Sequence, residues 1–231
     1  ALTITTPAGD PGSVDVIVFN LDGQAVRSTD AFTYTSATTY SVTYNANGAT
    51  SGSAPTDATA YDYNDPVTIE GAGTLARNGY EFSGWNTSDV GVGTAYSAGA
   101  TPAITADLSL YARWTAVADV GTSASSLSFG TRAVGSGSET TRTLAVTNSG
   151  AAIVSVSSPG ITITGTNVGD FSVSGGTCTD GGSITAFASC TIEVAFDPQA
   201  AGSRSATLSI ATSDGAQTVN LAGSGTGSGP T

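Results

Sequence analysis

The chain has 231 residues, of which only 10% are charged, and a formal net charge of −12 with six arginines and neither lysine nor histidine. An acidic chain without a basic cluster excludes nucleic acid as a partner and disfavours an anionic membrane surface. No apolar run approaches the roughly 20 residues that span a bilayer, so no membrane insertion is expected in this segment. Without His or Lys, the chain has no Ser/His/Asp triad, Schiff base or P-loop lysine.

Residues 1–36 predict a β-hairpin. The apolar run from Val14 to Val18 is followed by the turn sequence NLDG and by a second apolar run that ends at Tyr34, the pattern of two antiparallel strands. Residues 2–6 form one more expected strand. The phrases ITTPAGDPGSVDVIVFNLDGQAV and AFTYT resemble the C-terminal half of an IPT/TIG immunoglobulin-like domain. Three strands cannot bury one apolar face alone, so upstream residues or another chain are expected to complete it.

Residues 38–116 form a second expected unit, rich in aromatic residues. VTYNANG predicts a strand followed by an Asn-Gly turn, and two further strand-like phrases follow, GYEFSGWNT and LYARW. Together the phrases resemble the internalin B repeat, also called the Listeria/Bacteroides repeat, along essentially its full length. The resemblance implies a compact β-grasp-like module of a kind found in tandem on bacterial surface proteins. It also implies that Trp85 and Trp114 pack in the core.

A third unit is expected over residues 119–225, where strand-like runs recur at short intervals between Gly and Asn turns, as in a β-sandwich. The phrases LSFG, LAVTNSG, CTIEVAFDPQAAGSRSATLSI and VNLAGSGTG resemble the Hydin-type (ASH) immunoglobulin-like domain of choice-of-anchor D proteins. Residues 226–231 are expected to be a Gly/Ser linker. The fold class is therefore predicted as all-β: tandem small modules comprising a partial Ig-like sandwich, a β-grasp-like repeat and an Ig-like β-sandwich.

The chain contains two cysteines, Cys178 and Cys190, both in the third unit. Their spacing is not CxxC and no His accompanies them, which argues against a zinc site. A disulfide is the favoured interpretation, and a pair of reduced buried thiols is the alternative. A disulfide would stabilise a thin core by about 3 kcal/mol and would indicate an oxidising, extracytoplasmic location.

Carboxylates are the remaining candidates for chemistry. Asp62 and Asp65 lie closest in sequence, but YDYNDP predicts a turn, so no catalytic residue and no enzyme activity are expected. Metal and cofactor sites are likewise not expected, since no D-x-D-x-D-G pattern occurs; calcium at the junctions is a weaker hypothesis, with Asp119, Asp10 and Asp30 as its only candidates.

Two features suggest an interaction with glycans, one by binding and one by covalent attachment. Tyr61 and Tyr63 would share one face of an extended strand, and their rings could stack on sugars. Asn86 begins the sequon NTS, a candidate N-glycosylation site.

The expected function is that of a non-enzymatic structural or adhesive segment of a secreted bacterial surface protein. It would serve as a semi-rigid stalk, because the connectors at residues 36–39 and 115–120 are short, or as a subunit of an extracellular filament or lattice. A carbohydrate-binding module is the alternative. The expected partners are neighbouring modules, other copies of the chain, or glycans and host or matrix surfaces. A first residue Ala1 and the absence of Met suggest a processed chain or a fragment.

Overall fold

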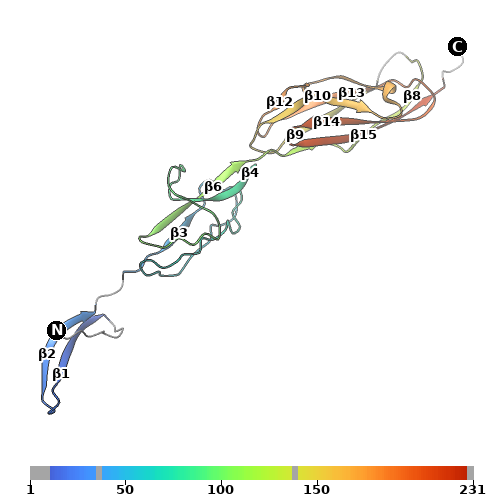
Figure 1. Cartoon of the computed structure of the whole chain (residues 1–231). Coiled ribbons are helices and arrows are strands. Elements are labelled where there is room, and N and C mark those ends of the chain that lie inside the picture. Colours follow the sequence, from blue (N-terminus) through green and yellow to red (C-terminus); the bar gives the residue numbers. More distant parts are fainter. Residues whose placement is uncertain (1–10, 35–37, 137–139, 228–231) are drawn as a thin grey trace.

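The computed structural model describes residues 11–34, 38–136 and 140–227. Within these ranges the chain is almost entirely β, with one short 3-10 helix, which confirms the predicted fold class. A hairpin, a small sheet and a larger two-sheet unit follow one another in a row (Figure 1). None of the helices in these ranges is long and apolar enough to cross a membrane.

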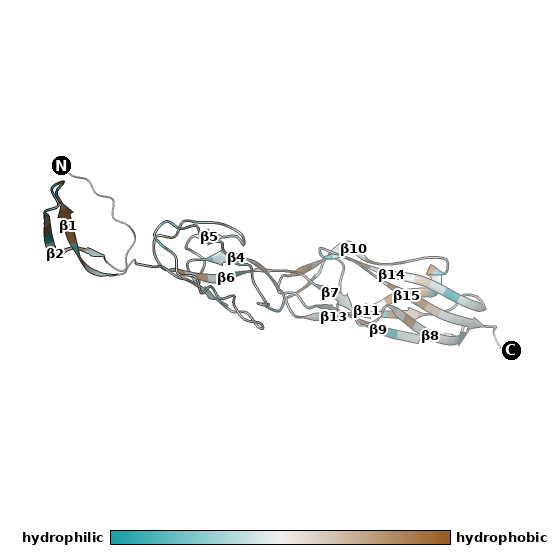
Figure 2. Ribbon diagram, turned by 90° about the horizontal axis from the view of Figure 1, so that it is seen from below, coloured by the Kyte–Doolittle hydropathy of each residue, from teal (hydrophilic) through white to brown (hydrophobic). Residues whose placement is uncertain are grey.

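The N-terminal unit is the predicted hairpin. Strands β1 (Gly12–Phe19) and β2 (Ala25–Tyr34) pair antiparallel, and a turn joins them in which the Gly23 N–H donates to the Asn20 carbonyl at 3.0 Å. Strand β1 is hydrophobic, as its brown colour in Figure 2 shows. Apolar side chains of both strands are nevertheless exposed: Phe19 in β1 is 71% exposed and Val26 in β2 is 73% exposed. The strand expected over residues 2–6 lies outside the described residues.

The middle unit is a four-stranded sheet with the order β3-β6-β4-β5. Its strands are β3 (Val42–Asn45), β4 (Tyr80–Asn86), β5 (Ala95–Tyr96) and β6 (Leu108–Ala116). The three aromatic phrases of the sequence thus become β3, β4 and β6. Strand β3 runs parallel to β6, whereas β4 is antiparallel to β6. The long segment between β3 and β4 contains no helix and is held by isolated bridges.

An aromatic cluster forms the core of this unit. Trp85 is fully buried, its ring centroid lies 4.8 Å from that of Tyr44 and 5.1 Å from that of Phe82, and its Nε1 donates to the Glu70 carbonyl at 2.8 Å. Trp114 packs against the same cluster and donates to the Asn47 carbonyl at 3.0 Å. Each indole therefore has a partner for its N–H while its rings pack, as a buried tryptophan requires. The predicted core role of both tryptophans is confirmed.

The C-terminal unit is a two-layer sandwich. One sheet has the order β12-β10-β14-β15-β8 and the other β11-β13-β9-β7. Its elements are β7 (Val120–Thr122), β8 (Ser126–Ala133), β9 (Thr140–Asn148), β10 (Val154–Thr164), η1 (Val168–Asp170), β11 (Phe171–Gly176), β12 (Ser183–Ile184), β13 (Ser189–Phe196), β14 (Gly202–Thr212) and β15 (Gly215–Thr226). The core lies between the layers and is separate from that of the middle unit.

The last strand extends slightly further than the sequence suggests. Strand β15 continues through Thr226, the first residue assigned to the linker, and Gly223 within it lies against the ring of Phe196, where a Cβ would come within 2.5 Å of a ring carbon. A glycine-rich tail is thus partly strand because the absence of side chains lets the sheet approach the core.

Candidate functional site

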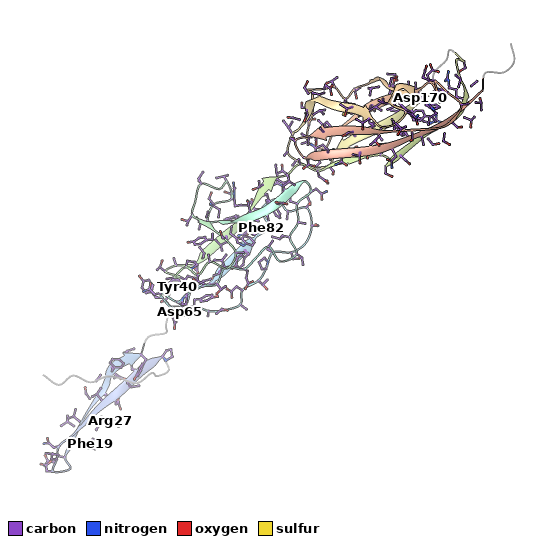
Figure 3. All side chains as sticks on the ribbon, turned by 45° about the vertical axis from the view of Figure 1, so that its right-hand side comes forward. Phe19, Arg27, Tyr40, Asp65, Phe82 and Asp170 are labelled. Atoms are coloured by element: carbon purple, nitrogen blue, oxygen red, sulfur yellow. A yellow bond between two sulfur atoms is a disulfide. The ribbon has the colours of Figure 1, made fainter. Side chains whose placement is uncertain are left out.

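The closest pair of acids in the sequence closes a turn. The Asp65 N–H donates to the Asp62 carbonyl at 3.1 Å, and the Asp65 carboxylate accepts the Asp62 N–H at 2.9 Å. This is the predicted turn, with its carboxylate bonded to the backbone two to three residues away. Tyr40 and Asp65 lie at the end of the middle unit nearest the hairpin (Figure 3).

The expected pair of stacking tyrosines does not form. Tyr61 bridges to Tyr40 and packs partly against the core, and the chain then turns, so that Tyr63 stands alone and is 63% exposed. The two rings share no strand face because no strand continues past Tyr61. The Tyr61 hydroxyl is also engaged, since it donates to the Asp57 carboxylate at 2.7 Å.

This hydrogen bond shifts the pKa of both partners. The bond to Asp57, aided by burial, raises the pKa of Tyr61. At Asp57, burial favours the protonated acid, but hydrogen bonds from the Tyr61 hydroxyl and from Thr59 outweigh it and lower the pKa of Asp57. The pair therefore fastens the loop that carries Tyr61 across the neutral pH range.

The sequon asparagine is structural. Asn86 is 4% exposed, its Nδ2 donates to the Gly93 carbonyl at 3.1 Å, and its Oδ1 accepts the N–H groups of Ser88 and Gly93. The predicted glycan at Asn86 conflicts with this arrangement, because the nitrogen that would carry the sugar is buried and bonded in the folded chain.

Of the calcium candidates, Asp119 uses its carboxylate to accept the Ser149 hydroxyl. Asp30 lies in the hairpin, where its backbone N–H donates to the Asp15 carboxylate at 3.0 Å, and Asp10 lies outside the described residues. Within residues 11–34, 38–136 and 140–227, no three Asp, Glu, Cys or His side chains cluster as metal ligands.

The two cysteines form the favoured disulfide, with Cα atoms 5.0 Å apart. It joins Cys190 at the start of β13 to the loop after β11, so it closes the edge of the smaller sheet. The predicted disulfide is confirmed.

A buried ion pair was not identified from the sequence. Asp170 is 4% exposed; its carboxylate pairs with Arg204 and also accepts the Gln199 N–H at 3.0 Å. It lies inside the sandwich, toward the end remote from the middle unit (Figure 3). Both oxygens of this carboxylate bind the protein's own groups, so the pair anchors η1 to β14 and does not form an open acidic site.

The most distinctive arrangement is the junction between the two folded units, which is built around Gly79. Its carbonyl oxygen accepts N–H groups from Val117 in the connector, at 3.0 Å, and from Ala151 in the loop between β9 and β10, at 3.1 Å. The Ala152 N–H adds a bond to the Val117 carbonyl at 3.0 Å. One carbonyl of the middle unit thus holds both the connector and the sandwich.

Only glycine fits at this position. Gly79 has φ +76, and a Cβ there would lie 2.6 Å from the Ala151 nitrogen and 2.8 Å from a ring carbon of Phe187. Phe187 itself has φ +58, an unusual conformation for a bulky residue, and its N–H donates to the Gly150 carbonyl at 3.1 Å. Such strain persists only where surrounding contacts impose it, which here are the bond to Gly150 and the close approach of Gly79.

Asn148 supports the sandwich side of the junction. It is fully buried, and its Oδ1 accepts the N–H groups of Gly150 and Asp119 at 3.0 and 3.3 Å. Its Nδ2 donates to three backbone carbonyls, those of Ala152, Ile184 and Thr185. A buried amide with all its groups bonded fixes these loops together. Neither Gly79 nor Asn148 stands out in the sequence, because Gly79 binds Val117 and Ala151 and Asn148 binds loops at Asp119 and Ile184, all far away along the chain.

Comparison with known proteins identifies the middle unit. Residues 40–113 match the family model of the Listeria-Bacteroides repeat domain. The predicted resemblance is confirmed, and nearly the whole of the sheet β3-β6-β4-β5 lies within the matched residues.

Two relatives come from Evansella cellulosilytica. One, described as a candidate membrane protein, is 47% identical over 77 residues, which are 32% of this chain and 11% of the relative. The other, described as a candidate Gly-rich membrane protein, is 34% identical over 98 residues, 42% of this chain and 11% of the relative. The chain thus spans about a tenth of the length of either relative.

Similar solved structures include an ASH/PapD-like domain of human CEP192, with a TM-score of 0.38, 14% identity and coverage of 48% of this chain and 87% of that one. They also include the VesB protease of Vibrio cholerae, with a TM-score of 0.34, 19% identity and coverage of 46% of this chain and 31% of that one.

Proposed function

We propose that this chain is a non-enzymatic structural segment of a secreted bacterial surface protein, and that it acts as a semi-rigid stalk. The observation that carries the proposal is the junction at Gly79, where hydrogen bonds join the repeat, the connector and the sandwich. Modules of one chain move relative to each other by default. Bending at this junction would break the bonds to Ala151 and Ala152 and separate Phe187 from Gly79, so we expect the two modules to keep one orientation.

Further observations support a structural role. The repeat and the sandwich have separate cores, as expected for units that are assembled in series. The buried Asp170 and the turn-forming Asp65 are engaged with the protein's own groups. The disulfide favours an oxidising, extracytoplasmic location, and the match to the Listeria-Bacteroides repeat together with the described relatives favours a bacterial envelope protein.

The stalk proposal has a second form, in which copies assemble into a filament or lattice through the hairpin. It is supported by the uncovered apolar side chains of β1 and β2, among them Phe19 and Val26. A two-stranded hairpin is marginally stable alone, and added strands are a common way to complete such an edge.

Residual dipolar couplings of backbone amides test the stalk. In a weakly aligned sample we expect one alignment tensor to describe residues 40–116 and 119–226 together, because the junction leaves no independent rotation. Two tensors of different magnitude would show a flexible tether between the modules and would contradict the proposal.

A further inference from the structure

Both modules place a strand near their start parallel to the strand that ends them. In the repeat, β3 pairs with β6, and in the sandwich β8 pairs with β15. The long strands of both modules run along the row of units and not across it (Figure 1). A pull on the two ends of the chain therefore acts along these strands.

In the repeat, side chains lengthen the contact beyond the paired strands. Four positions pair, from Val42 with Leu108 to Asn45 with Tyr111. Before them, Ser41 donates its N–H and its hydroxyl to Asp107 at 2.9 and 3.0 Å. After them, Asn47 donates to the Ala112 carbonyl at 2.9 Å and its own carbonyl accepts the Trp114 Nε1 at 3.0 Å.

In the sandwich the corresponding contact is longer. The β8–β15 pairing runs from Ser126 with Asn220 to Ala133 with Thr226. A hydrogen bond extends it at each end: the Asn220 N–H donates to the Ser125 carbonyl and the Val134 N–H to the Thr226 carbonyl, both at 3.0 Å. The short strand β7, which pairs with β9, precedes it.

The direction of pairing decides how such contacts fail under tension. When two adjacent parallel strands are pulled from their opposite ends, they must slide past each other, and all their hydrogen bonds stretch together. If the same strands are pulled apart from one shared end, the bonds break one after another. Forced unfolding follows the barrier to unfolding and not the equilibrium stability, so sliding gives the higher resistance.

We propose that the β3–β6 and β8–β15 pairs are tension clamps, and that this segment resists stretching along its length. The inference deepens the proposed stalk and rests on it for the direction of force. Stiffness and resistance are nevertheless separate properties: a stalk with a rigid junction can still have weak modules, and a flexible one can have strong modules.

The disulfide provides an internal marker. Cys178 and Cys190 are 12 positions apart, and the loop between them stays closed while the sandwich unfolds. Reduction of the disulfide should increase the length that the chain gains when the sandwich unfolds, by up to about 40 Å at roughly 3.3–3.6 Å per extended residue. The length gained when the repeat unfolds should not change. Comparison of the oxidised and the reduced chain therefore shows which unfolding event belongs to the sandwich and which to the repeat.

The test is single-molecule force spectroscopy on the full chain in two geometries. In the first, handles are attached at the two chain ends. In the second, both handles are attached at the same end of a strand pair. For the repeat they are attached at Thr39 and Ala106, which precede β3 and β6. For the sandwich they are attached at Ser125 and Thr218, which lie at the shared end of the β8–β15 pair. We expect each module to unfold at a clearly higher force in the first geometry. Equal forces in the two geometries would overturn the proposal for that module.

A side-chain variant tests the repeat clamp independently. Asp107→Ala removes both bonds to Ser41 and should lower the force at which the repeat unfolds from its ends. Asp62→Ala removes an acid of the same module that contributes only its backbone N–H and carbonyl to the turn, and should leave that force unchanged. An Asp107→Ala repeat that unfolds at the wild-type force would contradict the assigned role of Ser41 and Asp107. The dipolar couplings report on the stalk separately, so either proposal can fail while the other stands.

Discussion

At the scale of single residues, the junction depends on a glycine whose role can be separated from its backbone conformation. Gly79 and Gly99 lie in the same repeat with φ +76 and +78, but a Cβ at Gly99 meets nothing within 4 Å. Replacing either by alanine imposes the same left-handed strain, whereas only Gly79→Ala forces the sandwich loop away.

We expect Gly79→Ala to release the modules from one common orientation and Gly99→Ala to preserve it, as measured by dipolar couplings. If Gly79→Ala unfolds the repeat, the same measurement on Phe187→Gly tests the junction, because this change removes the ring and relieves the backbone strain at φ +58. Modules that keep one tensor in both junction variants would show that Gly79 and Phe187 do not fix the orientation.

Residue-scale features divide clearly into those that the sequence predicts and those that it does not. The disulfide and the two core tryptophans were predicted, since their residue types have few alternative roles. The predicted glycan at Asn86 conflicts with the structure because a sequon does not report burial: Asn86 is enclosed by the loop that ends at Gly93. The shared face predicted for Tyr61 and Tyr63 does not form, because the turn at Asp62 and Asp65 ends the extended segment at Tyr61. Phe187 gives no signal, since a positive φ at a bulky residue is imposed by distant contacts.

At the scale of elements, the disulfide reinforces a sheet edge. Strand β11 pairs only with β13 in its sheet, and the Cys178–Cys190 bond ties the end of that edge to β13. Replacing both cysteines by serine should lower the free energy of unfolding of the sandwich by about 3 kcal/mol, the value for a closed loop of roughly this length.

The two tryptophans make this prediction easy to check in the intact chain. Both lie in the repeat, so tryptophan fluorescence follows the unfolding of the repeat, while far-ultraviolet circular dichroism follows both modules. The sandwich of the double serine variant should unfold at a lower urea concentration than that of the wild type. The midpoint of the fluorescence transition, which reports on the repeat, should stay at the wild-type value. An unchanged sandwich midpoint would show that the bond adds no stability.

Strand positions were predicted better than the ways in which strands pair. The hairpin and the phrases that form β3, β4 and β6 were identified from alternation and turn residues, which are local signals. The parallel pairs β3–β6 and β8–β15 were not, because each joins segments separated by most of a module. Thr226, at the end of the last strand, was assigned to the linker because its pairing partner, Ala133, lies far away along the chain.

At the scale of the whole molecule, the exposed hairpin determines whether copies of the chain associate. Its apolar side chains remain exposed, including Leu21 and Phe32. If copies complete one another, sedimentation velocity should show concentration-dependent association that Val26→Asp in β2 abolishes. Val92→Asp, a change at a similarly exposed site in the repeat, should have no effect. A monomer at all concentrations would contradict the filament form of the proposal and leave the stalk form intact.

The parallel pairing of β8 with β15 also constrains how the sandwich is made. The second strand of the module finds its partner only when the twelve-residue final strand is available, so the larger sheet remains unfinished until nearly the whole module has been synthesised. Closing so long a segment is a slow step in folding. In a polypeptide that emerges gradually, from a ribosome or through a narrow export channel, β8 would thus lack its partner until the last strand has emerged, and the larger sheet would be completed late.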